Sequence, residues 1–455
     1  SRERTLFQNN QTIVIQELTS KIPAGDVPRQ KSVILTRDLV DTVRAGDEVI
    51  VSGIFAVEED LIVSTKSSFP LFSQYIEANS VQKRIERKLH DLTNKDVAII
   101  RKLAKHPRIR SKILRSIAPS IWGNQHVKNG IALVMFGGNR QAGSASHFIR
   151  GDINMLILGD PGMGKSQFLK YVTHVFPRSI LTNGKGASAV GLTASVRRDT
   201  ISGEWTLEGG AFVLADNGIC LLDEFDKMNE QDRVSIHEAM EQQSISISKA
   251  GIVASLRARC SVIAAANPIG GIYNQNLPLK ENVDLSDPIL SRFDIIAVVL
   301  DRSFVLQDYK LASHVLESHL RATAVSSPAE ENDREGLNTM PEWVTNDDPI
   351  PDEFLTKYVL FARENCHPKL QASDEARLAK FYSKLRQATA YTGGMSLTVR
   401  HLESIIRISI ANAKMRLSGV VSKTDLDYAI STVLESFIQS QKLSILQAQP
   451  QAFAA

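Results

Sequence analysis

The fold of this chain is decided by the stretch Gly159-Asp160-Pro161-Gly162-Met163-Gly164-Lys165-Ser166. Two glycines separated by four residues and followed by Lys and Ser form the pattern of a phosphate-binding loop. Glycines let backbone N–H groups turn toward a polyphosphate, and the helix that follows adds the positive end of its dipole. Because an apolar strand (155–158) precedes the loop and a helical segment (167–175) follows it, the motif predicts an α/β nucleotide-binding domain rather than a plain turn.

Each residue type in this loop suits a particular part of ATP. Lys165 is long enough to reach the β- and γ-phosphates, and the Ser166 hydroxyl is a ligand for Mg²⁺. We therefore expect ATP and Mg²⁺ as cofactors, with the nucleotide bound by the whole loop and by Gln167, the next residue.

Two adjacent carboxylates, Asp223 and Glu224, end the apolar run 219–222. Carboxylates at the end of a buried strand are costly unless a cation lies there. Asp223 is predicted to complete the Mg²⁺ shell, and Glu224 is predicted to polarise the attacking water. A solvated strand end is the alternative interpretation. The position of Asp223, 58 residues after Lys165 in the same strand pattern, argues against it.

Two further polar residues flank apolar strands of the same pattern. Asn267 follows the run 261–266, and ligands in open α/β sheets lie outside the carboxyl ends of strands, so it is predicted to orient the water. A turn before Pro268 is the other interpretation. Arg292 precedes the run 295–300 and suits the charge of a phosphoryl transition state, although a lone arginine is more often a surface ion-pair partner.

The segment 244–256 alternates Ser and Ile, breaks at Lys249-Ala250-Gly251, and resumes with apolar residues. This pattern predicts a β-hairpin with Lys249 near its tip. The pattern alone leaves open whether Lys249 meets an anionic ligand or only water.

Residues 1–82 are predicted to form part of an oligonucleotide-binding (OB) β-barrel, with a ligand-free β-module as the alternative. Short apolar runs broken by Gly and Pro indicate the β-structure that both interpretations require. Residues 83–115 carry twelve Lys and Arg against three acidic residues and read as basic linker helices. Their charges indicate either a solvated face or a nucleic-acid contact.

Strand-like and helical segments alternate in residues 116–325, which predicts a parallel-sheet ATPase core. An acidic linker is expected at 326–353, since it has four prolines and nine acidic residues against one Arg. A helical lid follows at 354–445, with helices near 354–365, 373–391, 397–415 and 424–443, the last with a capping start at Thr424. A frayed tail is expected at 446–455.

The composition bounds the class of protein. A length of 455 residues suggests about three domains, and 53 basic against 50 acidic residues give a net charge of +3. Any nucleic-acid binding must then come from a local patch. Three dispersed cysteines exclude a disulfide scaffold and a four-cysteine zinc site. No apolar run approaches the ~18 residues that cross a bilayer, so we expect an intracellular chain without membrane contact.

Together these motifs resemble, in order, those of the minichromosome maintenance (MCM) family of AAA+ replicative DNA helicases. They are the phosphate-binding loop, residues 222–228, Ala265-Ala266-Asn267-Pro268 and Ser291-Arg292-Phe293-Asp294. The resemblance covers nearly the whole chain. It implies an adenine pocket at 118–123, a helix-2 insert at 187–210, a presensor hairpin at 244–256 and a sensor-2 helix at 397–403. Segments 27–31, 38–41 and 433–438 are most similar to one particular eukaryotic subunit.

The resemblance also implies roles for individual residues. Ile121 and Trp122 would contact adenine. Arg292 and Arg400 would act on the nucleotide of a neighbouring subunit. DNA contacts would be made by Val196, Arg197, Ser248, Lys249 and Ala250.

The implied function is that of one subunit in a nuclear hetero-hexameric ring of MCM paralogues, which couples ATP hydrolysis to translocation on DNA and to unwinding at origins and forks. Its partners would be single- and double-stranded DNA and helicase loading and activating factors. The family's N-terminal helical subdomain and zinc module are missing, so we expect an upstream truncation and no zinc. Two alternatives remain: an AAA+ remodeller of proteins, and a ring position where ATP only joins subunits.

Overall fold

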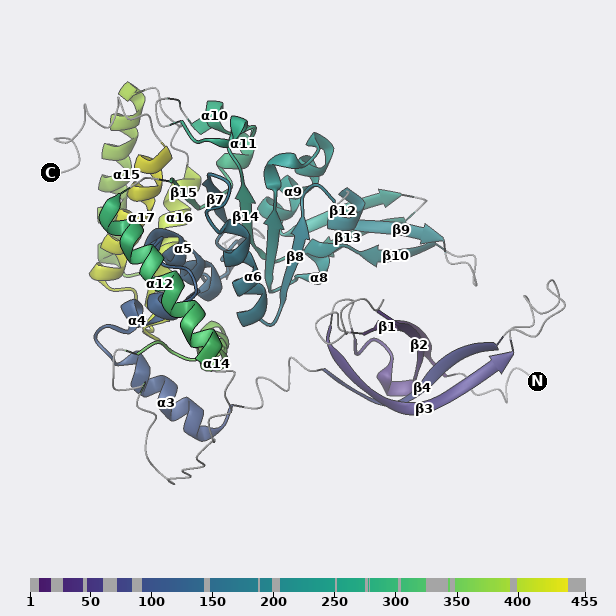
Figure 1. Cartoon of the computed structure of the whole chain (residues 1–455). Helices are drawn as coiled ribbons and strands as arrows, with labels where there is room; N and C mark the ends of the chain where they lie inside the picture. Colours follow the sequence, from purple (N-terminus) through teal and green to yellow (C-terminus); the bar gives the residue numbers. More distant parts are fainter. Residues whose placement is uncertain are drawn as a thin grey trace. The chain divides into compact units, whose positions relative to one another are not determined.

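The computed structural model describes residues 8–17, 28–43, 47–59, 72–83, 92–142, 148–186, 189–198, 205–249, 252–274, 277, 279–301, 304–324, 343, 348–392 and 399–440. The chain forms two compact units, Ser1–Asp91 and Leu92–Ala455, which are described separately (Figure 1). Ala250 and the predicted tail at 446–455 lie outside the described residues.

The smaller unit is a four-stranded sheet in the order β1-β2-β4-β3, built from β1 (Asn10–Gln16), β2 (Gln30–Thr36), β3 (Val49–Glu59) and β4 (Phe72–Lys83). A short helix, η3 (Arg37–Leu39), follows β2. The β2–β4 pair is parallel, and the other two pairs are antiparallel. Its small core contains Val33, Leu35 and Ala78. These strands confirm the predicted β-character of this region.

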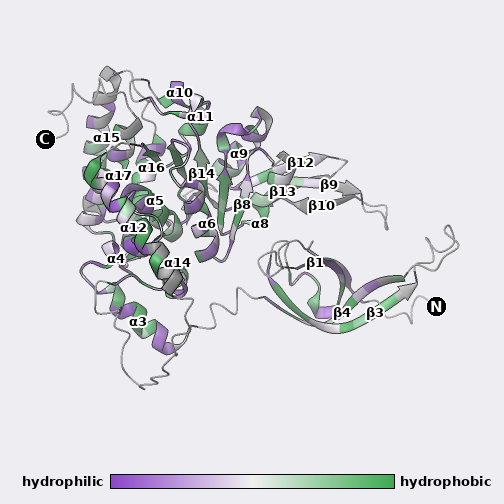
Figure 2. Cartoon of the chain, in the orientation of Figure 1, coloured by the Kyte–Doolittle hydropathy of each residue, from purple (hydrophilic) through white to green (hydrophobic). Residues whose placement is uncertain are grey.

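The basic segment contains two helices, α3 (Asn94–Ala104) and α4 (Ile109–Ser116). Thr93 and Asp96 form a capping box that starts α3. Hydrophobic and hydrophilic residues alternate along α3 (Figure 2). Ile100 and Leu103 are fully buried in the main core cluster of the larger unit. The two helices are therefore packed parts of that unit, whereas the sequence had suggested a linker.

The larger unit is built on five parallel strands in the order β15-β7-β14-β11-β8. Four of them match predicted strands: β7 (Met155–Gly159), β11 (Ile219–Asp223), β14 (Ser261–Ala266) and β15 (Ile295–Val299). The fifth, β8 (Ser179–Asn183), was not predicted. It lies at the sheet edge, where none of its side chains is fully buried, so polar residues interrupt its apolar pattern.

Successive residues of β7 face opposite sides of the sheet, as strand geometry requires. Met155 and Ile157 join a cluster with helices α5 (Gln125–Phe136) and α6 (Lys165–Val175). Leu156 and Leu158 join a second cluster that contains residues of helix α9 (Glu230–Gln242). Residues of α7 (Ala189–Leu192), β9 (Ala194–Arg198), α8 (Ala211–Leu214), β12 (Ser244–Lys249) and β13 (Ile252–Arg257) join the same cluster, and β10 (Trp205–Gly209) pairs with β9.

Short elements complete the larger unit: β5 (Gln141–Ala142), β6 (Phe148–Ile149), η4 (Phe225–Lys227), η5 (Ile269–Gly271), α10 (Leu279–Asn282) and α11 (Asp287–Leu290). The predicted lid helices are present as α14 (Asp352–Asn365), α15 (Ala372–Thr392), α16 (Val399–Met415) and α17 (Lys423–Ser440). A further helix, α12 (Val305–Ala324), was not predicted. The predicted cap of α17 was wrong by two residues, because Ser422 rather than Thr424 exchanges hydrogen bonds with Asp425.

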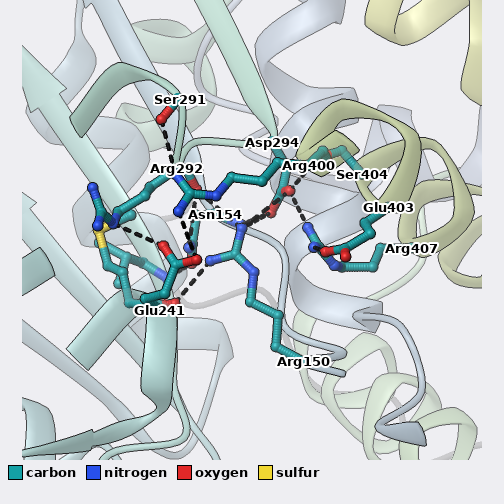
Figure 3. A network of polar contacts seen from close by, with 12 residues as sticks. Arg150, Asn154, Glu241, Ser291, Arg292, Asp294, Arg400, Glu403, Ser404 and Arg407 are labelled. Carbon is teal, nitrogen blue, oxygen red and sulfur yellow. Dashed lines mark hydrogen bonds and ion pairs between the residues drawn. The ribbon is translucent and has the colours of Figure 1, made fainter. Parts of the chain in front are cut away.

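One buried carboxylate joins lid helix α16 to the sheet. Asp294 lies directly before β15 and accepts hydrogen bonds from Arg150 and Arg407, from the Ser404 hydroxyl and from the backbone N–H of Asn154 (Figure 3). Burial alone raises the pKa of Asp294, but the two arginines and the hydrogen bonds outweigh it and hold the pKa below its usual value. The carboxylate therefore stays ionised and fixes the lid helix next to the amino end of β15.

We expect Asp294→Asn to lower the free energy of unfolding of the larger unit by about 3–5 kcal/mol, because it leaves two arginines without their buried counter-charge. Urea unfolding measures the change. Asp427→Asn is the control, since its ion pair with Arg377 is about half exposed on both sides and should contribute less than about 1 kcal/mol.

The difference between Asp294→Asn and the parent should also depend on pH. A carboxyl group with a depressed folded-state pKa stabilises above its unfolded-state pKa, and this stabilisation is lost as pH falls through the folded-state value. The difference should therefore be full at pH 6 and shrink below about pH 4. A difference that is constant from pH 6 to pH 3 would contradict this account of the network.

Candidate active site

The phosphate-binding loop connects β7 to α6, as predicted. Gly159 packs so closely on β15 that an added Cβ would lie 2.3 Å from the carbonyl oxygen of Val299. Gly162 and Gly164 have φ of 86° and 75°, a backbone region that favours glycine, and no atom lies within 4 Å of an added Cβ. The loop is thus an open cradle, and α6 starts from it without a side-chain cap. This arrangement fits a polyphosphate at the helix N-terminus.

Lys165 folds back over this cradle. Its Nζ donates to the carbonyl oxygens of Gly159, at 2.6 Å, and Asp160, at 2.8 Å. Burial lowers the pKa of Lys165, while Asp160, Asp226 and Asp223 oppose that effect. Ser166 is exposed at the start of α6, as are Pro161 and Gln167, whereas Met163 is partly buried against the main core cluster.

Asp160 has a structural contact that the sequence did not indicate. Its two carboxylate oxygens accept the backbone N–H groups of Tyr273, at 2.8 Å, and Asp301, at 3.2 Å. The side chain therefore ties the loop to the segments after β14 and β15.

Asp223 ends β11, and its Oδ1 accepts the backbone N–H of Glu224 at 2.9 Å. Glu224 has a left-handed φ of 53°. Its Oε1 lies 2.7 Å from Nζ of Lys227, and this hydrogen bond, more than any other cause, holds the pKa of Glu224 below its ordinary value. Glu224 is thus ionised and paired with a neighbouring lysine, which it must leave in order to act on a water molecule.

Asn267 follows the last residue of β14, and its backbone N–H donates to Oδ1 of Asp226 at 3.0 Å. Because β7, β14 and β11 are adjacent and parallel, the residues at their carboxyl ends share one edge of the sheet. The structure therefore brings Lys165, Asp223, Glu224 and Asn267 to the same edge. Asp226, to which the sequence assigned no role, links the ends of β11 and β14.

The predicted adenine segment lies beside the same helix. The hydroxyl of Tyr171, on α6, donates to the backbone carbonyl of Ser116 at 3.0 Å, just before this segment. Ile121 is partly buried against the main core cluster, and Trp122 is also partly buried. An adenine contact by Ile121 and Trp122 remains a prediction.

Arg292 lies at the other edge of the sheet, where the amino ends of the parallel strands lie. It precedes β15, and its carbonyl oxygen is 3.4 Å from Nδ2 of Asn154, which precedes β7. The loop follows β7, so one full strand, about 16 Å at 3.3 Å per residue, separates the two positions. Arg400 is at this second edge as well, because its Nη1 donates to Oγ of Ser291 at 3.1 Å. Both arginines are therefore placed away from the loop of their own chain.

The residues predicted to contact DNA lie on two hairpins that extend from the same side of the sheet (Figure 1). Lys249 pairs with Ile252 in the last described rung of β12–β13, and Ser248 is exposed. Arg197 pairs with Thr206 in β9–β10. Val196 packs partly against the second core cluster, which gives it a structural contact. The DNA contacts remain predictions.

Two features are absent from the described residues. No group of three or more His, Cys, Asp or Glu side chains is arranged to hold a metal ion there. Over the same residues, every helix is too short or too polar to cross a membrane.

The phosphate-binding loop after β7, the parallel sheet and the helical lid define a P-loop protein of the AAA+ class. Comparison with family models narrows this class. The MCM OB domain matches residues 1–59, the MCM P-loop domain matches 96–319, and the MCM AAA-lid domain matches 353–437. The chain belongs to the MCM family, as its motifs had indicated.

Individual relatives agree. The DNA replication licensing factor Mcm2 of Drosophila melanogaster is 51% identical over 452 residues, which are 99% of this chain and 50% of that protein. The mcm2 protein of Schizosaccharomyces pombe is 50% identical over 99% of this chain and 55% of its own length. The MCM protein of Saccharolobus solfataricus is 41% identical over 96% of this chain and 60% of its length. The subunit that the sequence had singled out, subunit two, is confirmed as the type that this chain resembles. The chain spans about half the length of the eukaryotic relatives.

We expect Lys165→Ala to weaken ATP binding on the order of 10²-fold or more, because each charge-assisted contact to phosphate is worth ~1.5–3 kcal/mol. Fluorescence titration with a labelled ATP measures affinity. The fold should persist, since the hydrogen bonds that the described residues show for the Lys165 ammonium group go to carbonyl oxygens of its own loop. Lys170→Ala, an exposed position on the same helix, is the control. Equal affinity in Lys165→Ala and the parent would remove the loop from the nucleotide site.

Proposed function

We propose that this chain is a subunit of a hexameric ATP-driven DNA helicase in which each complete ATPase site is shared by two subunits. One observation carries the proposal. The loop and the carboxylates lie at the carboxyl edge of the sheet, whereas Arg292 and Arg400 lie at the amino edge. A chain that presents the two halves of one site on opposite edges needs a neighbour to complete either half.

The carboxyl edge would bind the nucleotide. Lys165 would exchange its two carbonyl acceptors for phosphate oxygens, and Ser166 with Asp223 would hold Mg²⁺. The metal ion would neutralise phosphate charge when bound. Glu224 would accept the proton of a water molecule after leaving Lys227, and Asn267 would orient that water.

The amino edge would serve the neighbour's nucleotide. Arg292 and Arg400 would donate to the γ-phosphate held by the loop of the adjacent subunit and stabilise charge in the transition state. An arginine finger of this kind is worth ~10³–10⁵ in turnover.

The hairpins would couple this chemistry to DNA. The β12–β13 hairpin follows α9 directly, and α9 begins a few residues after Glu224, so the nucleotide edge and the hairpin are joined through one helix. Lys249 and Arg197 would contact backbone phosphates in the channel of the ring. We propose MCM paralogues as ring neighbours, single- and double-stranded DNA as substrates, loading and activating factors as partners, and the nucleus as location.

In paired mixtures with a partner paralogue, Arg292→Ala should depress hydrolysis at the partner's loop by ~10³-fold or more, because the transition-state charge there loses its counter-charge. Lys165→Ala should silence this chain's own loop instead. ATPase rates of pairs in which only one loop is intact separate the two effects. Arg377→Ala, an exposed arginine on α15, is the control. Full turnover by the isolated chain as a verified monomer would overturn the shared site.

Lys249→Ala should weaken DNA binding and reduce the salt dependence of binding by about one phosphate contact, with little effect on ATP hydrolysis. Binding to single-stranded DNA at several salt concentrations measures the slope. Arg257→Ala is the matched control, since Arg257 is exposed at the opposite end of the same hairpin. Identical slopes for Lys249→Ala and the parent would exclude the hairpin tip as a DNA contact.

A further inference from the structure

A single carboxylate, Glu241, contacts both arginines at the amino edge. Its Oε2 lies 3.0 Å from Nε of Arg292, and its Oε1 accepts a hydrogen bond of 2.7 Å from Nη2 of Arg400 (Figure 3). The two arginines come from segments 108 residues apart, one before β15 and one on the lid helix α16. Glu241 stands on a third element, at the end of α9.

Without this carboxylate, the guanidinium groups would repel each other. Burial lowers the pKa of Arg292, and Arg400 and Arg150 act in the same direction, whereas Glu241 opposes them. Glu241 pairs with both Arg292 and Arg400, so one negative charge holds two positive ones together, and these three side chains keep a net positive charge (Figure 3). An anionic ligand is therefore attracted to this edge with the arginines already ordered.

The backbone under the three side chains is fixed as well. Arg150 donates to the carbonyl oxygens of Met240, at 2.8 Å, and Arg292, at 3.1 Å, and it also binds Asp294. Met240 is the residue before Glu241. One partly buried guanidinium thus joins the end of α9, the start of β15 and, through Asp294, the lid helix.

The described contacts also leave part of the Arg292 guanidinium to an incoming anion. Nη1 donates to the carbonyl oxygen of Pro288 at 2.6 Å, and Nε faces Glu241. Within the described part of the chain, no hydrogen bond uses Nη2. The Pro288 carbonyl and Glu241 thus occupy Nη1 and Nε, and Nη2 is the nitrogen that a ligand would meet.

We propose that Glu241 is a positioning residue that holds Arg292 and Arg400 as a preformed pair for the terminal phosphate of a nucleotide bound by the adjacent subunit. This inference rests on the proposed shared site and adds a residue to it. Glu241 acts through the arginines and does not itself contact the nucleotide. A preformed pair reduces the ordering required in the transition state, where small misplacements cost up to ~10²-fold in rate.

The experiment uses Lys165→Ala chains paired with a partner whose loop is intact, so that all turnover comes from the partner's loop. Glu241→Ala should lower kcat about 10- to 10²-fold and leave KM for ATP within about 2-fold, because the loss falls on the transition state. Glu241→Gln should lower kcat less than Glu241→Ala does, since the amide oxygen can still accept a hydrogen bond from one arginine. Glu403→Ala is the control: Glu403 is as exposed as Glu241 and pairs with Arg407 instead.

A double-mutant cycle separates positioning from a general structural effect. In an Arg400→Ala chain, Glu241→Ala should cost less than it does alone, because one of the two groups that Glu241 holds is already gone. Equal losses in both backgrounds, or a loss equal to that of Glu403→Ala, would overturn the positioning role. If Arg292→Ala lowers turnover and Glu241→Ala does not, only this inference fails. If Arg292→Ala has no effect, the shared site itself fails.

Discussion

The common direction of five strands is the constraint on which the rest of this structure depends. In a parallel sheet every strand delivers the residues that follow it to one edge and receives the residues that precede it at the other. Lys165, Asp223 and Asn267 follow strands, whereas Arg292 precedes one. Their separation is therefore a property of topology, which no side-chain rotation can undo. The proposed site between subunits is built on this separation.

Polar contacts in the interior fix the edge of the sheet that carries Arg292 and Arg400. Asp294 and Arg150 are largely buried, and each would be costly without the other. Together with Arg407 they fasten a helix of the lid to β15, the strand that follows Arg292. Lid and sheet thus present Arg400 and Arg292 as parts of one surface. Other lid residues pack into the main core cluster, so apolar contacts also hold the lid against the sheet.

The sequence predicted the elements whose signal is local. The loop was found because its glycines, lysine and serine are adjacent, and four strands were found because they are uniformly apolar and buried. Edge strand β8 was missed because half-exposed polar residues interrupt its pattern. The contacts of Glu241 and Asp294 were missed for another reason: their partners lie between about 50 and 160 residues away, and neither carboxylate carries a local signal of these contacts. The roles of Arg292 and Arg400 came from resemblance, and the strand order supplied their positions.

Lys165 is already satisfied by two carbonyl oxygens of its own loop. When a phosphate group binds in the loop, Lys165 consequently exchanges one set of hydrogen-bond acceptors for another and does not simply gain contacts. A neutral carbonyl is replaced by an anionic oxygen, and hydrogen bonds to ionised acceptors are roughly twice as strong as neutral ones. The binding free energy gained by this exchange therefore grows with the negative charge of the group that binds in the loop. The loop should discriminate by phosphate charge, so that a nucleoside without phosphates leaves the lysine where it is.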